Sequence, residues 1–293
     1  MDHRVSKSII ACTIDHAESA VIRLKTSGSD GYTLCGCKTL PHGLQSIVAG
    51  KEKRMLGKLK GYCSEWKEEG LVLCVGTDGL LPLPACFPGD TTPEESQEYC
   101  NIEAEYFLSK PEEYGCDIAR YASGDATENN KLLLFYPAEP CSRIAKYFSD
   151  EHKILFAGTA QLPLVHLSKF TEEPQVILEL ENSSVLLTIA RNGEIEKLSF
   201  HQVKTREEAE YFTMNELMEN PICRQTSMQV TGTRADKAML SLIGAETSCP
   251  LKPLGIPSSL SISNPQRLST SAPAVVKAIS AAVMALADQS ETS

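Results

Sequence analysis

The sequence lacks the features that mark several specialised classes of protein. It has no run of 18 or more apolar residues, so we expect no membrane-spanning helix. Its start, MDHRVSKSIIACTID, has neither the apolar stretch nor the small-residue cleavage site of a secretion signal. No G-x-x-x-x-G-K-[ST] motif occurs, which excludes a P-loop. Acidic residues outnumber basic ones by 38 to 28, and this balance argues against binding of duplex nucleic acid.

What remains is an ordinary globular composition with many cysteines. The 293 residues are 42% apolar and 23% charged, enough for one large or two medium domains. The 11 cysteines lie mostly in apolar runs, so we interpret them as small buried hydrophobic residues in a reducing compartment. Cys35 and Cys37 form the closest pair of cysteines. The sequence offers no second cysteine pair and no His-x-x-His to complete a metal site, so we expect no bound metal.

One order of elements occurs twice along the chain. Hydrophobic periodicity predicts three strands, a helix and a buried strand in each repeat. The first repeat comprises strands 8–15, 19–25 and 32–40, a helix at 51–69 and a strand at 71–76. The second comprises strands 175–181, 184–191 and 194–203, a helix from Thr205 and a strand at 226–232. The Asn192-Gly193 turn is a strong hairpin signal within the second repeat. The repeated order indicates an internal duplication.

An insertion separates the two repeats. Residues 81–90 contain three prolines and are predicted as an irregular connector. The capping box at Thr92 begins a helix on which Tyr99, Ile102 and Tyr106 share one face. A face of this kind usually packs on a core. Residues 115–123 and 131–137 are predicted as a strand pair.

The duplicated order resembles the actin-like superfold, and four segments resemble the PilM family of type IV pilus assembly proteins and the cytoplasmic domain of type II secretion L proteins. They are IIACTIDHAESAVIRLK, PGDTTPEESQEYCNIEAEYFLSKPEEYGCDIARY, MQVTGTRADKAMLSLIGAE and SNPQRLSTSAPAVVKAISAAVMALA. Each segment is weakly specific alone, so the weight comes from their order along nearly the whole chain.

The resemblance implies an α/β, actin-like (ribonuclease H-like) fold of duplicated βββαβα halves with an inserted α+β subdomain. We expect the first half at residues 1–170, with the insertion at about 82–150. The second half follows at 171–293, and a helix at 271–288 packs back on the fold.

In this family, turns of the form Asp-x-Gly followed by Ser or Thr hold the nucleotide phosphates. The candidate nucleotide-binding residues here are Asp15, Ser19, Glu179, Ser183, Ser184, Gly232 and Thr233. However, Ala17 and Glu181 stand at the two glycine places, and Glu18 adds a further negative charge. A Cβ obstructs close backbone approach, and a carboxylate repels phosphate. We therefore expect weak or absent Mg·ATP binding, no resident cofactor and no hydrolysis, although solvated turn acids are also common.

The resemblance implies a cytoplasmic protein, peripheral at the inner membrane, that binds a peptide of a membrane-anchored partner. Tyr99, Ile102, Tyr106 and Phe107 are the candidate groove residues, with core packing as the alternative. The leading hypothesis is a non-catalytic scaffold in pilus or secretion assembly. One alternative is an active ATPase or small-molecule kinase of the same superfold, with Asp15 as the candidate base. Another is an actin-like interaction protein without a pilus role.

Overall fold

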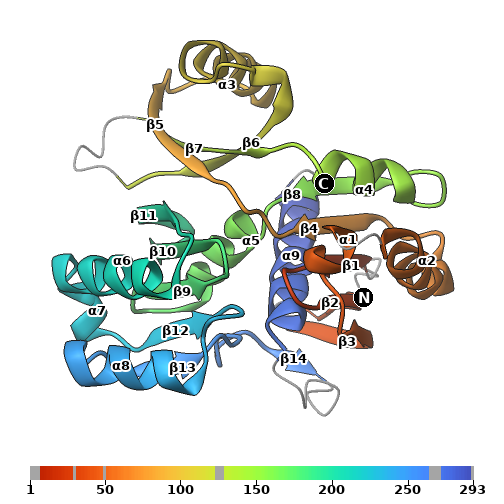
Figure 1. Ribbon diagram of the computed structural model, residues 1–293. Coiled ribbons are helices and arrows are strands. Elements are labelled where there is room, and N and C mark those ends of the chain that lie inside the picture. Colours follow the sequence, from red (N-terminus) through yellow and green to blue (C-terminus); the bar gives the residue numbers. More distant parts are fainter. Residues whose placement is uncertain (1–6, 29–30, 49–50, 123–128, 264–271, 292–293) are drawn as a thin grey trace. The chain divides into compact units, whose positions relative to one another are not determined.

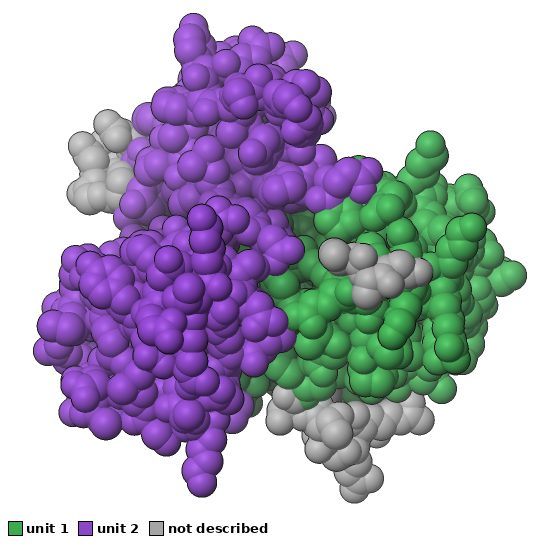
Figure 2. Space-filling model, viewed as in Figure 1, with its two compact units in different colours: residues 1–76, 140–170, 254–293 green, residues 77–139, 171–253 purple. Residues whose placement is uncertain are grey.

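A computed structural model describes residues 7–28, 31–48, 51–122, 129–263 and 272–291. Three features expected from the sequence lie outside these residues: positions 124–128 of the expected loop, the Asn264-Pro265 segment of the family resemblance, and the expected helix start at Ser271. Two compact units account for the chain (Figure 2). Unit 1 comprises residues 1–76, 140–170 and 254–293, and unit 2 comprises residues 77–139 and 171–253. This division by contacts differs from the expected division by sequence order, because the C-terminal segment packs with the first repeat.

The sheet of unit 1 has the strand order β14-β3-β2-β1-β4-β8. Its strands are β1 (Ser8–Ile14), β2 (Ser19–Ser27), β3 (Gly31–Leu40), β4 (Leu71–Val75), β8 (Ile154–Gly158) and β14 (Ile262–Ser263). β1 pairs antiparallel with β2 and parallel with β4, which places it at the centre of the sheet. β1 and β4 are buried on both faces, as their continuous apolar sequences predict.

The helices of unit 1 are α1 (Leu44–Val48), α2 (Glu52–Cys63), α4 (Cys141–Phe148), α5 (Gln161–His166) and α9 (Pro273–Glu291). α9 packs against β1 and β2 (Figure 1). Every residue from 274 to 286 of α9 is buried, and small alanines allow its close approach to the sheet. Within the described part of the chain, none of the helices combines the length and the apolar character that a membrane crossing requires.

The main sheet of unit 2 repeats the arrangement of the first. Its order is β11-β10-β9-β12-β13, in which β9 pairs antiparallel with β10 and parallel with β12. The strands are β9 (Gln175–Leu180), β10 (Ser184–Arg191), β11 (Glu194–Gln202), β12 (Met228–Thr231) and β13 (Leu251–Pro253). The helices are α6 (Arg206–Glu219), α7 (Ile222–Gln225) and α8 (Lys237–Thr247). The common strand order and directions confirm the predicted duplication.

The insertion contributes a three-stranded antiparallel sheet and one helix to unit 2. Its order is β5-β7-β6, from β5 (Leu81–Phe87), β7 (Asn129–Pro137) and β6 (Tyr114–Arg120), and α3 (Pro93–Phe107) follows β5 in the chain. The predicted connector at 81–90 was wrong, because most of it forms β5. Pro82 and Pro84 are tolerated there because β5 is an edge strand, where outward-facing positions need no ladder N–H.

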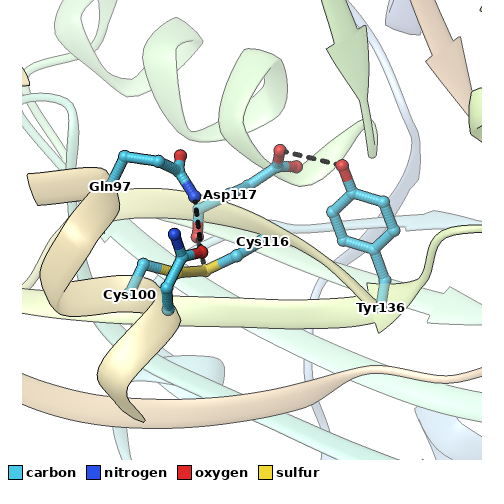
Figure 3. Close-up of a disulfide and its surroundings, with 6 residues drawn as sticks. Gln97, Cys100, Cys116, Asp117 and Tyr136 are labelled. Atoms are coloured by element: carbon cyan, nitrogen blue, oxygen red, sulfur yellow. Dashed lines mark hydrogen bonds between the residues drawn. A yellow bond between two sulfur atoms is a disulfide. The ribbon is translucent and has the colours of Figure 1, made fainter. Parts of the chain in front are cut away.

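The cysteines agree with the sequence interpretation at six positions. They depart from it at Cys86, which is exposed, at Cys35 and Cys37, which are half-buried, and at one disulfide pair. Cys12, Cys63, Cys74, Cys141, Cys223 and Cys249 are free and buried. Cys100 of α3 and Cys116 of β6 form a disulfide, which ties the inserted helix to its sheet (Figure 3). The pairing was not predicted, because it depends on a helix crossing a sheet rather than on spacing.

Candidate functional site

The first candidate turn follows β1 in unit 1 and is closed by its own backbone. The N–H of Asp15 donates to the Glu18 carbonyl at 2.9 Å. The carbonyl of Asp15 accepts from the N–H of Leu44 at 2.9 Å, at the start of α1. The Ser19 hydroxyl donates to the His42 carbonyl at 2.6 Å. The backbone groups of this turn and the Ser19 hydroxyl therefore form hydrogen bonds within unit 1.

The Asp15 carboxylate lies in an ion pair with a lysine from the other end of the chain. Lys277 of α9 places its Nζ 2.9 Å from Asp15 Oδ2, and both side chains are buried. The N–H of His16 donates to Asp15 Oδ1 at 3.0 Å. Burial by itself would raise the pKa of Asp15, but the Lys277 ammonium and the His16 hydrogen bonds outweigh it and hold that pKa well below its usual range. Asp15 is an ionised, fully compensated carboxylate.

Lys277 was missed at the sequence level, although a signal for it exists. It is a charged residue inside the apolar run APAVVKAISAAVMALA. A charge on a helix that is buried all round needs a buried partner of opposite sign. The sequence indicates that such a partner must exist, and the structure shows that it is Asp15.

Glu18 occupies the N-terminus of α9. Its Oε1 accepts from the N–H of Ala274 at 3.0 Å, in the first turn of the helix. The N-terminal N–H groups and dipole of a helix form a general site for anions, including phosphate. Here a carboxylate of the same unit takes that place, so Glu18 acts as a helix cap as well as a source of negative charge.

The second and third candidate turns lie together in unit 2. Glu181 Oε2 accepts from both the N–H of Thr233, at 3.1 Å, and its hydroxyl, at 2.8 Å. Gly232 has φ of +110°, and a Cβ there would lie 2.2 Å from the Leu180 carbonyl oxygen, so only glycine fits. The third turn thus packs directly on the second, and Glu181 takes the donors of Thr233.

The remaining candidates of this region lie in or beside strands. Glu179 is buried in β9 opposite Thr231 of β12, and Ser184 is buried at the start of β10. The Ser183 hydroxyl donates to Asp78 Oδ1 at 2.6 Å. The structure therefore brings Glu181, Gly232 and Thr233 together within unit 2, and Ser183 is engaged by a different carboxylate.

The candidate partner-binding residues form an exposed surface on α3, which we call the α3 surface: Tyr99, Ile102, Tyr106 and Phe107. The Tyr106 side chain is 81% exposed and the Phe107 side chain 58% exposed. The core contacts of α3 come instead from Cys100 and Ala104, which pack with Phe87, Leu133 and Phe135. Core packing, the alternative considered for these residues, holds in part for Tyr99, whose ring centroid lies 5.1 Å from that of the buried Phe87. It is wrong for Ile102, Tyr106 and Phe107, which are exposed.

The hydrophobic periodicity of α6 also predicted its buried face only in part. The pattern predicts Tyr211, Met214 and Met218 on its inner face. Met214 does pack against the core, but Tyr211 and Met218 are 65% and 63% exposed. The inner face is formed by Ala209, Thr213, Glu216 and Leu217. Large side chains of α6 therefore lie on both faces, since Leu217 is buried in the core and Phe212 packs against it.

Comparisons with known proteins place the fold. No protein-family model matches the sequence, and no curated protein matches it significantly. A solved structure described as a "PilM-PilN type IV pilus biogenesis complex" aligns over 96% of this chain and 99% of its own chain, with a TM-score of 0.66 at 12% identity. A Bacteroides thetaiotaomicron protein with an actin-like ATPase fold and unknown function aligns over 89% of this chain and 95% of its own, with a TM-score of 0.51 at 10% identity. The chain has the actin-like fold, and its PilM-like architecture, expected from the sequence, is confirmed.

Proposed function

We propose that the protein is a non-catalytic actin-like scaffold with degraded ATP binding. The observation that carries this proposal is the buried Asp15–Lys277 ion pair. A Mg²⁺ ion requires oxygen ligands and dehydrates reluctantly. Asp15 already has a cation 2.9 Å away, and that ammonium would repel a divalent ion brought to the same carboxylate.

The groups that would bind phosphate also have carboxylate partners already. The N-terminus of α9 holds the Glu18 carboxylate, and the N–H and hydroxyl of Thr233 hold the Glu181 carboxylate. A phosphate brought to either place would have to displace a carboxylate and then lie beside its negative charge. Each turn is therefore satisfied without a nucleotide.

Titration calorimetry with Mg·ATP and Mg·ADP tests the loss of nucleotide binding. We expect no binding at ligand concentrations up to about 1 mM, a Kd range that corresponds to about 4 kcal/mol or less. A phosphate-release assay at the same concentrations should give no turnover. Micromolar binding would contradict the proposal and favour the alternative of an active ATPase or small-molecule kinase.

The scaffold would bind its partner through the α3 surface. Its four apolar side chains alternate with Glu94, Glu95, Glu98, Glu103 and Glu105, and α3 contains no basic residue. A complementary peptide would present apolar side chains together with Lys or Arg, because charge of opposite sign favours association. The juxtamembrane segment of a membrane-anchored protein fits this description. The similar fold of the structure described as a PilM-PilN type IV pilus biogenesis complex supports a role in pilus assembly. The family resemblance of the sequence extends this proposal to secretion assembly and to the cytoplasmic face of the inner membrane.

The partner proposal is tested with the N-terminal peptide of a single-span membrane protein encoded beside this gene. We expect fluorescence anisotropy to show binding of equal strength with and without Mg·ATP. Replacement of Tyr106 and Phe107 by alanine should weaken binding about 30-fold or more, as the loss of an aromatic hot spot does. Tyr211→Ala, which removes a tyrosine of α6 that is 65% exposed, is the control and should bind normally. Equal binding by all variants would contradict the assignment of the α3 surface.

A further inference from the structure

A basic cavity of about 150 Å³ lies over α1 and α2 in unit 1. It has several times the volume that a single water molecule needs. Its lining residues are His42, Ser46, Lys51, Arg54, Met55 and Lys58. Met55 is buried and forms an apolar wall, and every other lining side chain carries a hydrogen-bond donor or a positive charge. Among the described residues, no carboxylate lines the cavity.

The surrounding segment has a charge opposite to that of the whole protein. Residues 51–60 contain five of the 28 lysines and arginines and one acid, in a chain of net charge −10. The acid, Glu52, is paired with Arg143 at 3.1 Å. Lys60 is paired with Glu151 at 3.4 Å.

Three cations of this segment converge on the cavity without a carboxylate partner among the described residues. Lys51, Arg54 and Lys58 are spaced by three and four positions, which places them along one face of α2. All three are exposed, and like charges at this spacing repel one another. A bound anion would remove this repulsion and gain attraction from all three groups.

Neutral donors lie beside the cations. The helix α2 begins beside the cavity, and its N-cap residue Lys51 makes no side-chain hydrogen bond to the first N–H groups of the helix. The Ser46 hydroxyl and the His42 imidazole line the cavity and lie 3.4 Å apart. Guanidinium, ammonium, hydroxyl and N–H groups are together the donor set that binds phosphate oxygens.

We propose that this cavity is a binding site for a phosphate monoester, carried by a small molecule or by a lipid headgroup. The three cations neutralise the two charges of the group, and Ser46 and the α2 N-terminus orient its oxygens. The lining residues include none of the candidate nucleotide-binding residues and none of the α3 surface, although the carbonyl of His42 accepts a hydrogen bond from the Ser19 hydroxyl. The proposal therefore does not depend on the scaffold function.

The test compares two sources of phosphate on the full chain at low ionic strength. Calorimetry with inorganic phosphate measures the free ligand. Co-sedimentation with vesicles of phosphatidylcholine, with and without phosphatidic acid, measures the headgroup. The variant is Arg54→Gln/Lys58→Gln. The control is Lys237→Gln/Lys252→Gln, which removes the same charge from exposed lysines of unit 2.

We expect binding of at least one probe by the wild type and a loss of about 30-fold in the cavity variant, because each surface cation contributes about a fivefold factor toward an anionic group. The control should change by less than about twofold. Binding of phosphate alone would identify a free ligand, and binding of phosphatidic acid vesicles alone would identify a lipid. Binding of neither probe, or an equal loss in the control, would overturn the proposal.

Discussion

Replacement of Lys277 by methionine should strongly destabilise unit 1. Methionine keeps the length and the apolar stem of the lysine but removes its charge. Among the described residues, Asp15 would then be a buried carboxylate with only the His16 hydrogen bonds to compensate it. Breaking a buried ion pair by removing one partner costs about 3–5 kcal/mol, because the other charge stays buried. At a urea m-value of about 2 kcal/mol/M, this loss lowers the unfolding midpoint by roughly 2 M.

The assay uses the single tryptophan of the chain. Trp66 lies in unit 1, as do both members of the ion pair, so its fluorescence in urea reports the unfolding of that unit. The double variant Asp15→Asn/Lys277→Met removes both charges, and we expect it to regain most of the lost stability. Lys252→Met changes an exposed lysine of unit 2 and should leave the transition unchanged.

The same variant should alter the pH dependence. In the wild type the pKa of Asp15 is lowered by the fold, so its stabilising effect is fully present above the ordinary value of about 4 and is lost only as the pH falls through the lowered pKa. Without Lys277, burial dominates and raises the pKa of Asp15, so protonation then favours the folded variant. The difference in unfolding free energy between wild type and variant should therefore shrink from pH 7 to pH 5. A difference below about 1 kcal/mol, equal at both pH values, would refute the reasoning, since that is the range of a solvated pair.

Three further predictions concern other parts of the fold. Gly232→Ala should lower the free energy of unfolding by about 3 kcal/mol, measured by circular dichroism in urea, because φ is positive and the Leu180 carbonyl blocks the new Cβ; an unchanged midpoint would contradict this. Reduction of the Cys100–Cys116 disulfide, or Cys100→Ser, should destabilise the insertion by about 3 kcal/mol for a loop of this length, and a reductant should not affect the serine variant further. Burial lowers the pKa of His166 to about 4, so the wild type should lose up to about 3 kcal/mol of stability as the pH falls from 6.5 to 4, and His166→Gln should lack this component; parallel pH profiles would exclude it.

The sequence by itself determined the order of elements and much of the local pairing. Alternation and turn signals depend on residues close in the chain, so they can be interpreted without tertiary contacts. The Asn192-Gly193 turn shows this: both residues have positive φ, and Arg191 pairs with Glu194 as a hairpin requires. The recurrence of one order at 8–76 and 175–232 was sufficient to predict the actin-like fold.

The tertiary structure decided which charges meet and which faces are covered. Asp15 and Lys277 come from opposite ends of the chain, and only the packing of α9 on β1 and β2 brings them together. Periodicity predicts that a helix has an apolar face, but not whether that face or a row of small residues contacts the sheet. On α3, Cys100 and Ala104 contact the core and Tyr106 is left exposed, because the volume between packed elements decides which side chains fit.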